Sequence, residues 1–345
     1  MSSDDQAARR DFYRRIGGNH LHPLWESMAS LVPEQPRSPC IPYIWKYAEV
    51  RPALMEACGL ISADEAIRRV LVLENPGLPG SSAVTQSLYA GLQVIMPGEV
   101  APSHRHTQTA LRLVVEGKSA YTSVEGERVD MQPGDFIVTP SWTWHDHGNE
   151  GSEAVVWLDG LDIPLMRFFD CGFAENSRGE AHSARRRDGD ALARYGSNLL
   201  PVDFRARPGA SPLFAYPFSR SRAVLLQLTD GTAPDPCHGM KMRFVNPATG
   251  GPAIPTMGAY LQRLPEGFSG QSIRSTDGAV FHVVEGNGAV EIGGRLVEFG
   301  PRDTFVVPSW TAYRFHGVET ASFIFSFSDR PVQEALCIWR EERLA

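Results

Sequence analysis

Two neighbouring stretches, GEVAPSHRHTQTALRLVVEG at residues 98–117 and GDFIVTPSWTWHDHGN at residues 134–149, carry the strongest signal in this sequence. In the first stretch, His104 and His106 stand two residues apart in a run typical of a β-strand. Alternate side chains of a strand share a face, so both imidazoles point the same way. The second stretch predicts a strand, a proline-broken turn and a further strand that carries His145. Three imidazoles can therefore converge on one metal ion.

The spacing of these residues resembles the two motifs of the cupin superfamily, whose members fold as double-stranded β-helix (jelly-roll) barrels. Eight residues fall on the pattern: Gly98, His104, His106, Gly117, Gly134, Pro140, His145 and Asn149. Two positions depart from it. Ala110 stands where the family usually has a glutamate ligand, and Trp142 replaces the inner glycine of the second motif.

The missing glutamate bears on the chemistry of the site. A metal held by three neutral histidines keeps its full charge and has open positions, which suits a chelating anionic substrate together with dioxygen. Three histidines alone also fit a metal-dependent isomerase that uses zinc, manganese or nickel, or a small-molecule-binding cupin. A further alternative is that the histidines are half-buried barrel residues hydrogen-bonded to the backbone.

An internal repeat predicts a second barrel. The segment from Val114, VVEGKSAYTSVEGERVDMQPGDFIVTPSWTWHDHG, aligns with VVEGNGAVEIGGRLVEFGPRDTFVVPSWTAYRFHG from Val283. The alignment places Ile273, Ser275 and Tyr313 where His104, His106 and His145 stand in the first copy. We therefore expect one metal-binding barrel and one metal-free barrel. His282 and His316 lie out of register with the ligand positions, so we expect both to be structural.

The chain of 345 residues is long enough for about two domains. We predict a mainly β fold with a helical N-terminal region at 1–75, cupin barrel 1 at 76–170, a connector at 171–245, cupin barrel 2 at 246–330 and a C-terminal helix at 331–345. In the N-terminal region, helix-like spacing covers residues 4–16 and 46–69, and Ser62 and Glu65 form a candidate capping box.

Composition limits the function classes. The net charge of −7 argues against a nucleic-acid partner, and no apolar run is long enough to span a membrane. The five cysteines lack the spacing of a disulfide framework or a zinc knuckle, and no signal peptide is visible, so we expect a cytoplasmic protein. No nucleotide-binding glycine loop appears, and we expect no organic cofactor.

Three polar side chains share the predicted inward face with the ligands. Arg112 would place a guanidinium beside the metal, where burial is costly unless an anion meets it. A one-residue bulge would instead turn Arg112 to solvent. Gln108 can orient a ligand or bound oxygen. His147 faces the same cavity and, with an ordinary pKa, can take up a phenolic proton; the alternative is a supporting or core role.

Four stretches, SLYAGLQVIMPGEVAPSHRHTQTALRLVVEG, PSWTWHDHGN, WLDGLDIP and VNPATGG, resemble the gentisate 1,2-dioxygenases and the related salicylate and 1-hydroxy-2-naphthoate dioxygenases. The resemblance covers nearly the whole chain. It implies an enzyme of aromatic-compound catabolism that uses one Fe(2+) per chain, in the first barrel. Such an enzyme opens an ortho-hydroxy carboxylate ring with O2 between the carboxyl- and hydroxyl-bearing carbons. Gentisate would give maleylpyruvate, and salicylate or hydroxynaphthoate are the alternative substrates.

The resemblance also implies which residues meet the substrate. An arginine at the Arg112 position helps to bind it, and Arg68 or Arg69 is a further candidate for the carboxylate, although either can be simple surface charge. The other substrate-binding candidates are Tyr89, Gly91, Asp159 and Trp142. For Tyr89, Gly91 and Asp159 the alternative is ordinary barrel packing or a turn. Family analogy suggests a tetramer or dimer, and Leu111 and Leu113 are expected to pack between barrels or between subunits.

Overall fold

The computed structural model describes residues 3–177, 186–205, 209, 211–229 and 231–344, so parts of the predicted connector lie outside the described residues. The chain forms a small unit of residues 1–37 and a large unit of residues 38–345. The small unit contains α1 (Ser3–Gly18) and α2 (Leu24–Leu31), so the helix predicted over 4–16 is confirmed. Within this unit, the Trp25 indole donates a hydrogen bond to the Tyr13 hydroxyl at 2.8 Å.

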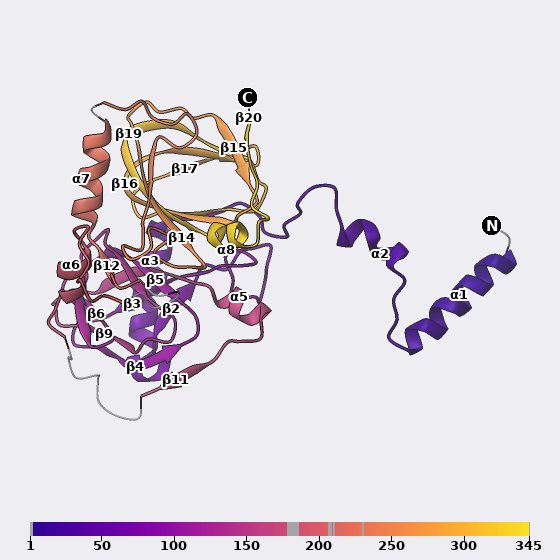
Figure 1. Cartoon of the computed structure of the whole chain (residues 1–345), viewed down its shortest axis with the longest axis horizontal. Coiled ribbons are helices and arrows are strands. Elements are labelled where there is room, and N and C mark those ends of the chain that lie inside the picture. Colours follow the sequence, from indigo (N-terminus) through magenta and orange to yellow (C-terminus); the bar gives the residue numbers. More distant parts are fainter. Residues whose placement is uncertain (1–2, 178–185, 206–208, 210, 230, 345) are drawn as a thin grey trace. The chain divides into compact units, whose positions relative to one another are not determined.

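The large unit consists mainly of two jelly-roll β-barrels, as expected (Figure 1). The first barrel is built from two antiparallel sheets. The six-stranded sheet has the order β12 (Ala215–Tyr216), β8 (Phe136–Thr139), β5 (Ala110–Glu116), β10 (Val155–Leu161), β3 (Tyr89–Ile95) and β2 (Arg69–Val72). The five-stranded sheet has the order β11 (Ala174–Asn176), β4 (Val100–His106), β9 (His145–Asn149), β6 (Ala120–Val124) and β7 (Glu127–Asp130).

The second barrel forms one continuous nine-stranded sheet. Its main path is β1 (Tyr43–Trp45), β18 (Thr304–Val307), β16 (Ala279–Ile292), β19 (Tyr313–Ser328), β14 (Gly258–Leu264) and β13 (Met240–Arg243), to which β15 (Ser272–Ser275), β17 (Arg295–Phe299) and β20 (Glu341–Leu344) are paired. The long strands β16 and β19 correspond to the pairs β5/β6 and β9/β10 of the first barrel. In the first barrel, residues 117–119 separate β5 from β6 and residues 150–154 separate β9 from β10, and the strands fall into two sheets.

Most of the large unit's core lies where the two barrels pack together. One cluster joins Leu111 and Leu113 of the first barrel to Phe323, Phe325 and Phe327 of the second. Each barrel also has its own interior cluster, around Trp157 in the first and around Phe315 in the second. The prediction that Leu111 and Leu113 pack between barrels is therefore confirmed.

The strand through the first motif differs from the expected one. We expected one continuous run from His104 to Arg112, but β4 ends at His106 and β5 begins at Ala110, and the two strands belong to different sheets. Alternation along one strand therefore does not relate Arg112 to the histidines. Its direction is set by the sheet that contains β5.

The predicted segments outside the barrels are more mixed than expected. The N-terminal region contains α3 (Tyr47–Leu60) and α4 (Ala63–Ala66), where the backbone N–H of Glu65 donates to the Ser62 hydroxyl as the capping box predicts, but also β1 and β2. These two strands complete the sheets of the second and first barrels respectively. The connector contains β11, α6 (Asp190–Tyr195), β12, α7 (Phe218–Thr229) and β13.

The prediction of a C-terminal helix over 331–345 is wrong for most of its length. α8 (Arg330–Ala335) is short, and β20 follows it and pairs with β15. The first barrel ends in the same way, because α5 (Ile163–Phe168) is followed by β11, which pairs with β4. The internal repeat therefore includes a terminal helix and strand, and sheet pairing takes precedence over local helical spacing. Among the described helices, none has the length and apolar character needed to cross a membrane.

Candidate metal and substrate site

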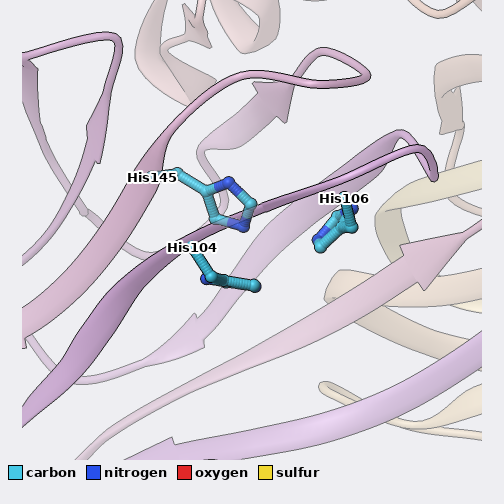
Figure 2. A group of neighbouring side chains, drawn as sticks. All are labelled: His104, His106 and His145. Carbon is cyan, nitrogen blue, oxygen red and sulfur yellow. The ribbon is translucent and has the colours of Figure 1, made fainter. Parts of the chain in front are cut away.

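His104, His106 and His145 converge inside the first barrel (Figure 2). β4 supplies the first two and β9 supplies the third, with His104 and His145 paired across the strands. Nitrogen atoms of the three rings lie within 4.8 Å of one another, and the ring centroids are 4.1–5.1 Å apart. Among the residues that the structure describes, this is the one group of three or more such side chains arranged to hold a metal ion.

Backbone carbonyls fix the orientation of two of these rings. His106 Nδ1 lies 2.8 Å from the Gln108 carbonyl oxygen, and His145 Nδ1 lies 2.9 Å from the Thr143 carbonyl oxygen. A carbonyl only accepts, so each Nδ1 carries the proton and donates, which leaves the Nε2 lone pair for a ligand. The Nε2 atom of His145 is buried and has no hydrogen-bond partner. An unpaired buried acceptor beside two further imidazoles fits a bound transition-metal ion.

Burial keeps these histidines neutral. It lowers the pKa of His104 to about 3 and that of His106 to about 4, with the positive charge of Arg68 acting in the same direction. Burial also lowers the pKa of His145 well below its usual value, and neighbouring Arg112 adds to this effect. Neutral imidazole is the form that binds metals, so His106 and His145 can ligate through Nε2 at neutral pH, whereas Nδ1 of His104 lies next to Arg68.

Arg112 lies inside the barrel, as expected. It is 4% exposed and pairs across the sheet with Asp159, which is 5% exposed. The two side chains form a buried ion pair with Nε 3.5 Å from Oδ1, and Nη1 donates to the Thr139 hydroxyl at 2.6 Å. The alternative that a bulge turns Arg112 to solvent is wrong, because the side chain is buried and lies next to that of Asp159 on the neighbouring strand.

Asp159 is held by one further contact. Its carboxylate accepts a hydrogen bond from the Trp157 indole at 3.0 Å. Burial raises the pKa of Asp159 to about 6, and Arg112 opposes that rise. The Arg112 Nε makes no hydrogen bond within the described structure. This Nε is the atom that faces Asp159 in the ion pair.

Tyr89 and Gly91 lie on the same wall as this ion pair. Gly91 pairs with Asp159 across β3 and β10. A Cβ at Gly91 would lie 2.8 Å from the Tyr89 hydroxyl, so the glycine makes room for the phenol. Burial, with the charge of Asp159 next, raises the pKa of Tyr89, so the phenol is a hydrogen-bond donor and not a base. The structure thus brings Tyr89, Gly91, Asp159 and Arg112 together.

Only one of the two candidate arginines reaches the histidines. A guanidinium nitrogen of Arg68 lies 2.6 Å from His104 Nδ1, and the same nitrogen donates to the Pro102 carbonyl at 3.1 Å. Burial lowers the pKa of Arg68 to about 10, with the charge of Arg112 adding to it. Arg69 is buried in an ion pair with Glu99 instead. Arg69 is the first residue of β2, whereas Arg68 lies in the bend before that strand.

His147 lies deeper than the three converging rings. It is 1% exposed, its Nδ1 lies 3.0 Å from the Thr122 hydroxyl, and its ring centroid is 5.8 Å from that of His145. Burial lowers the pKa of His147 well below its usual value, and Arg112 adds to this effect. The expectation that His147 titrates near neutrality therefore does not hold. Its Nε2 is buried without a partner, so the ring remains a neutral acceptor beside the site.

Two further candidates do not reach the cluster through their side chains. Trp142 adopts a φ of 58°, the left-handed backbone for which cupins usually have glycine. Its ring packs on Phe173 and on the guanidinium of Arg105, which points away from the face shared by His104 and His106. Gln108 orients His106 with its backbone carbonyl, whereas its side-chain amide lies next to Gly172.

Sequence reasoning missed Thr139, Trp157 and Thr122, which hold Arg112, Asp159 and His147 respectively. Thr139 comes directly before Pro140 of the second motif, and Trp157 stands two residues before Asp159 on one strand, so both had a weak positional signal. Thr122 had none, because its partner is defined only by the pairing of β6 with β9.

The sequence and the fold were compared with known proteins. A cupin domain model matches residues 91–161 and 260–327, one match in each barrel. The chain is 49% identical to gentisate 1,2 dioxygenase 1 of Aquipseudomonas alcaligenes, over 97% of this chain and 96% of that protein. It is 38% identical to gentisate 1,2-dioxygenase of a Streptomyces species, over 99% and 98%.

Solved structures of salicylate 1,2-dioxygenase from Pseudaminobacter salicylatoxidans share the whole fold. One superposes with a TM-score of 0.91 at 34% identity, covering 97% of each chain. Another, an adduct with gentisate, superposes with a TM-score of 0.90 at 33% identity, covering 99% of this chain and 96% of that one.

Proposed function

Because the chain belongs to the gentisate 1,2-dioxygenase family of bicupin ring-cleaving dioxygenases, we propose that it opens gentisate between the carboxyl- and hydroxyl-bearing carbons. The proposed reaction inserts both atoms of O2 and yields maleylpyruvate. The observation that carries this proposal is the placement of a buried arginine, Arg112, beside three neutral, converging histidines. A carboxylate and a metal chelate can be bound there at the same time.

We propose Fe(2+) as the ion that His104, His106 and His145 hold. When bound, the ion would supply coordination positions for the substrate oxygens and for O2, and a route for electrons from the ring. The chain's own contribution is orientation. Three neutral ligands leave the site with the positive charge of Arg68 and Arg112, which favours an anionic substrate.

The substrate carboxylate is proposed to bind Arg112. The ion pair with Asp159 fixes the position of the Arg112 guanidinium, and the hydrogen bond to Thr139 fixes the plane of this group. A charge-assisted hydrogen bond in this buried environment is stronger and more directional than the same bond in water. Tyr89 can donate to a substrate oxygen, because burial keeps its hydroxyl protonated. Arg68, 2.6 Å from His104, is the second candidate for the carboxylate.

His147 is proposed to accept a hydrogen bond and not to act as the general base. The ring is held at Nδ1 by Thr122 and has an unpaired Nε2. Its pKa is well below the usual value because of burial, so it is a weak base for a phenolic proton. A phenol that chelates a metal becomes more acidic, and a neutral acceptor nearby is then sufficient.

Salicylate is the second candidate substrate. The fold similarity to a salicylate 1,2-dioxygenase favours it. Two full-length relatives at higher identity carry the gentisate name, which favours gentisate as the first choice. The second hydroxyl of gentisate also makes its ring more electron-rich. We further propose a homo-oligomer, a tetramer or dimer, which light scattering coupled to gel filtration would measure.

The test is oxygen consumption by anaerobically Fe(2+)-loaded protein offered gentisate, salicylate and 1-hydroxy-2-naphthoate in parallel. Ultraviolet spectra would identify ring-opened products. Rapid uptake with gentisate, and less with the others, supports the proposal. Uptake with salicylate to the same extent would identify a broad-range enzyme. No uptake with any of them by iron-loaded protein would overturn ring cleavage and favour an isomerase or binding protein.

A further inference from the structure

The second barrel contains a cavity at the place where the first barrel holds its histidines. Ile273 pairs with Tyr313 across β15 and β19, as His104 pairs with His145, and Ser275 corresponds to His106. These three side chains line a small cavity. The second barrel therefore has a cavity at this place, and all three histidines are replaced there.

The polar wall of the cavity has been rebuilt as well. Phe281 pairs with Ser326 across β16 and β19, at the positions where Arg112 and Asp159 form their ion pair in the first barrel. The guanidinium and its carboxylate are thus replaced by a ring and a hydroxyl. Ser326 is 2% exposed, and its hydroxyl, which borders the cavity, is buried without a hydrogen-bond partner.

A tyrosine has moved along the same strand. The first barrel has Tyr89-Ala90-Gly91, whereas the second has Gly258-Ala259-Tyr260 at the matching positions of β14. A Cβ at Gly258 would lie 2.6 Å from the Tyr260 hydroxyl, just as a Cβ at Gly91 would lie 2.8 Å from that of Tyr89. Each tyrosine leans over the glycine two residues away, so both barrels have a phenol on this wall.

The cation of the second cavity comes from β13. Lys241 lines the cavity, with its amine 4.8 Å from the centre of the Tyr260 ring and 5.7 Å from that of Phe281. Burial lowers the pKa of Lys241 to about 8, so the amine is still mostly charged at neutral pH. Among the described residues, no carboxylate lies within the 4.0 Å of an ion pair with Lys241.

The other charges of the cavity have partners of their own. Asp277 accepts a hydrogen bond from the Trp339 indole at 2.9 Å, and Arg330 pairs with Glu334 at 2.7 Å. Glu341 lies 3.8 Å from Arg343. The partner of Asp277 is neutral, so its negative charge also acts on Lys241, although no carboxylate of the described residues lies within ion-pair distance of the amine.

We propose that this cavity binds a small carboxylate anion with an apolar body, at a site that is separate from the histidine cluster. The carboxylate would meet the Lys241 amine, with the hydroxyls of Tyr313 and Ser326 as further partners. The apolar body would lie against Ile273, Phe281 and Val307. A dianion such as phosphate fits less well, because the carboxylates of Asp277 and Glu341 border the same space.

The chain's lysines make the proposal testable at one site. The sequence has three, Lys46, Lys118 and Lys241. Reductive methylation with formaldehyde and cyanoborohydride, followed by peptide mass spectrometry, reports the reactivity of each separately. We expect benzoate near saturation to slow the modification of Lys241 by at least about fivefold at constant ionic strength. Lys118, which is exposed, should react at an unchanged rate.

Two controls separate this site from the first barrel and from simple apolar binding. Benzyl alcohol, the neutral analogue, should not protect Lys241. In calorimetric titrations with benzoate, Lys241→Met should remove one binding event that the matched surface variant Lys118→Met retains. Unchanged labelling of Lys241 in benzoate, equal protection by benzyl alcohol, or identical titrations of the two variants would each overturn the proposal. Because the readout is at Lys241, it is independent of whether the first barrel cleaves gentisate.

Discussion

The guanidinium of Arg112 lies 3.5 Å from the carboxylate of Asp159, and both side chains are buried beside the three converging histidines. Burying two charges is costly, and a pair of this kind is seldom kept for stability alone. The Nε of Arg112 makes no hydrogen bond even within this pair. This geometry supports the proposal that the guanidinium is held in position for an incoming anion.

Substitution of Arg112 tests this role. Arg112→Met should raise the KM for the aromatic carboxylate by roughly 10- to 150-fold, because a hydrogen bond to a charged group contributes about 1.5–3 kcal/mol. Metal content should remain near that of the parent protein, since Arg112 is not one of the three candidate metal ligands. Steady-state kinetics and metal analysis check both. The double variant Arg112→Met/Asp159→Asn removes the uncompensated carboxylate and controls for misfolding. A KM within threefold of the parent value would contradict the assignment.

The two barrels provide a matched test of the metal site. His104→Ala should lose tight metal binding, because two imidazoles hold a divalent ion much more weakly than three. Ser275→Ala, at the position in the second barrel that corresponds to His106, should retain it. Metal content after gel filtration, measured by mass spectrometry, gives the answer. Equal losses from both variants would contradict a single metal site in the first barrel.

Trp142 is expected to be dispensable for substrate binding. Trp142→Gly relieves a left-handed backbone that costs about 1–2 kcal/mol and loses contacts with Phe173 and Arg105 of a similar total size. Stability should therefore change little, and the substrate KM should stay within about threefold of the parent value. Thermal unfolding and kinetics would measure these. A large rise in KM would place the indole in the substrate pocket.

Glu116 links the two barrels. Its buried carboxylate accepts from Arg51 at 2.7 Å and from Arg302 of the second barrel at 3.0 Å. Both arginines are nearly half exposed, so solvent weakens the pair. We expect Glu116→Gln to lower the free energy of unfolding by about 1–2 kcal/mol. The exposed Glu342, paired with Arg274, supplies the control Glu342→Gln, with an expected loss below about 1 kcal/mol. Denaturant unfolding would resolve the two, and equal losses would show that the link adds nothing.

The ligand set and the barrel count could be predicted from the sequence. His104, His106 and His145 follow from the alternation of side chains and from motif spacing, and Ile273, Ser275 and Tyr313 follow from aligning the repeats. Arg112 and Asp159 were also identified, although the argument for Arg112 assumed one strand where the structure has two. The prediction was right because Arg112 pairs with Asp159 on β10, a contact between distant parts of the chain.

The remaining features needed the tertiary structure. Neither spacing nor composition distinguishes Arg68 from Arg69, because the choice depends on whether His104 or Glu99 lies next to each side chain. The ring of Trp142 packs on Phe173 and Arg105 and not on the histidines, and its backbone there has a φ of 58°. The low pKa of His147 comes from burial, which depends on the packing around it.

The sequence by itself determined the fold class, the number of barrels and the three candidate metal ligands, because these depend on periodicities of a few residues and on a repeat that is visible in the letters. Only the tertiary structure decided which charges face each other, as it did for Arg112 with Asp159 and for Lys241, which has no ion-pair partner among the described residues. Long-range pairing of strands sets those distances. The free energy of a buried charge depends on what surrounds it in space, and not on its neighbours in the chain.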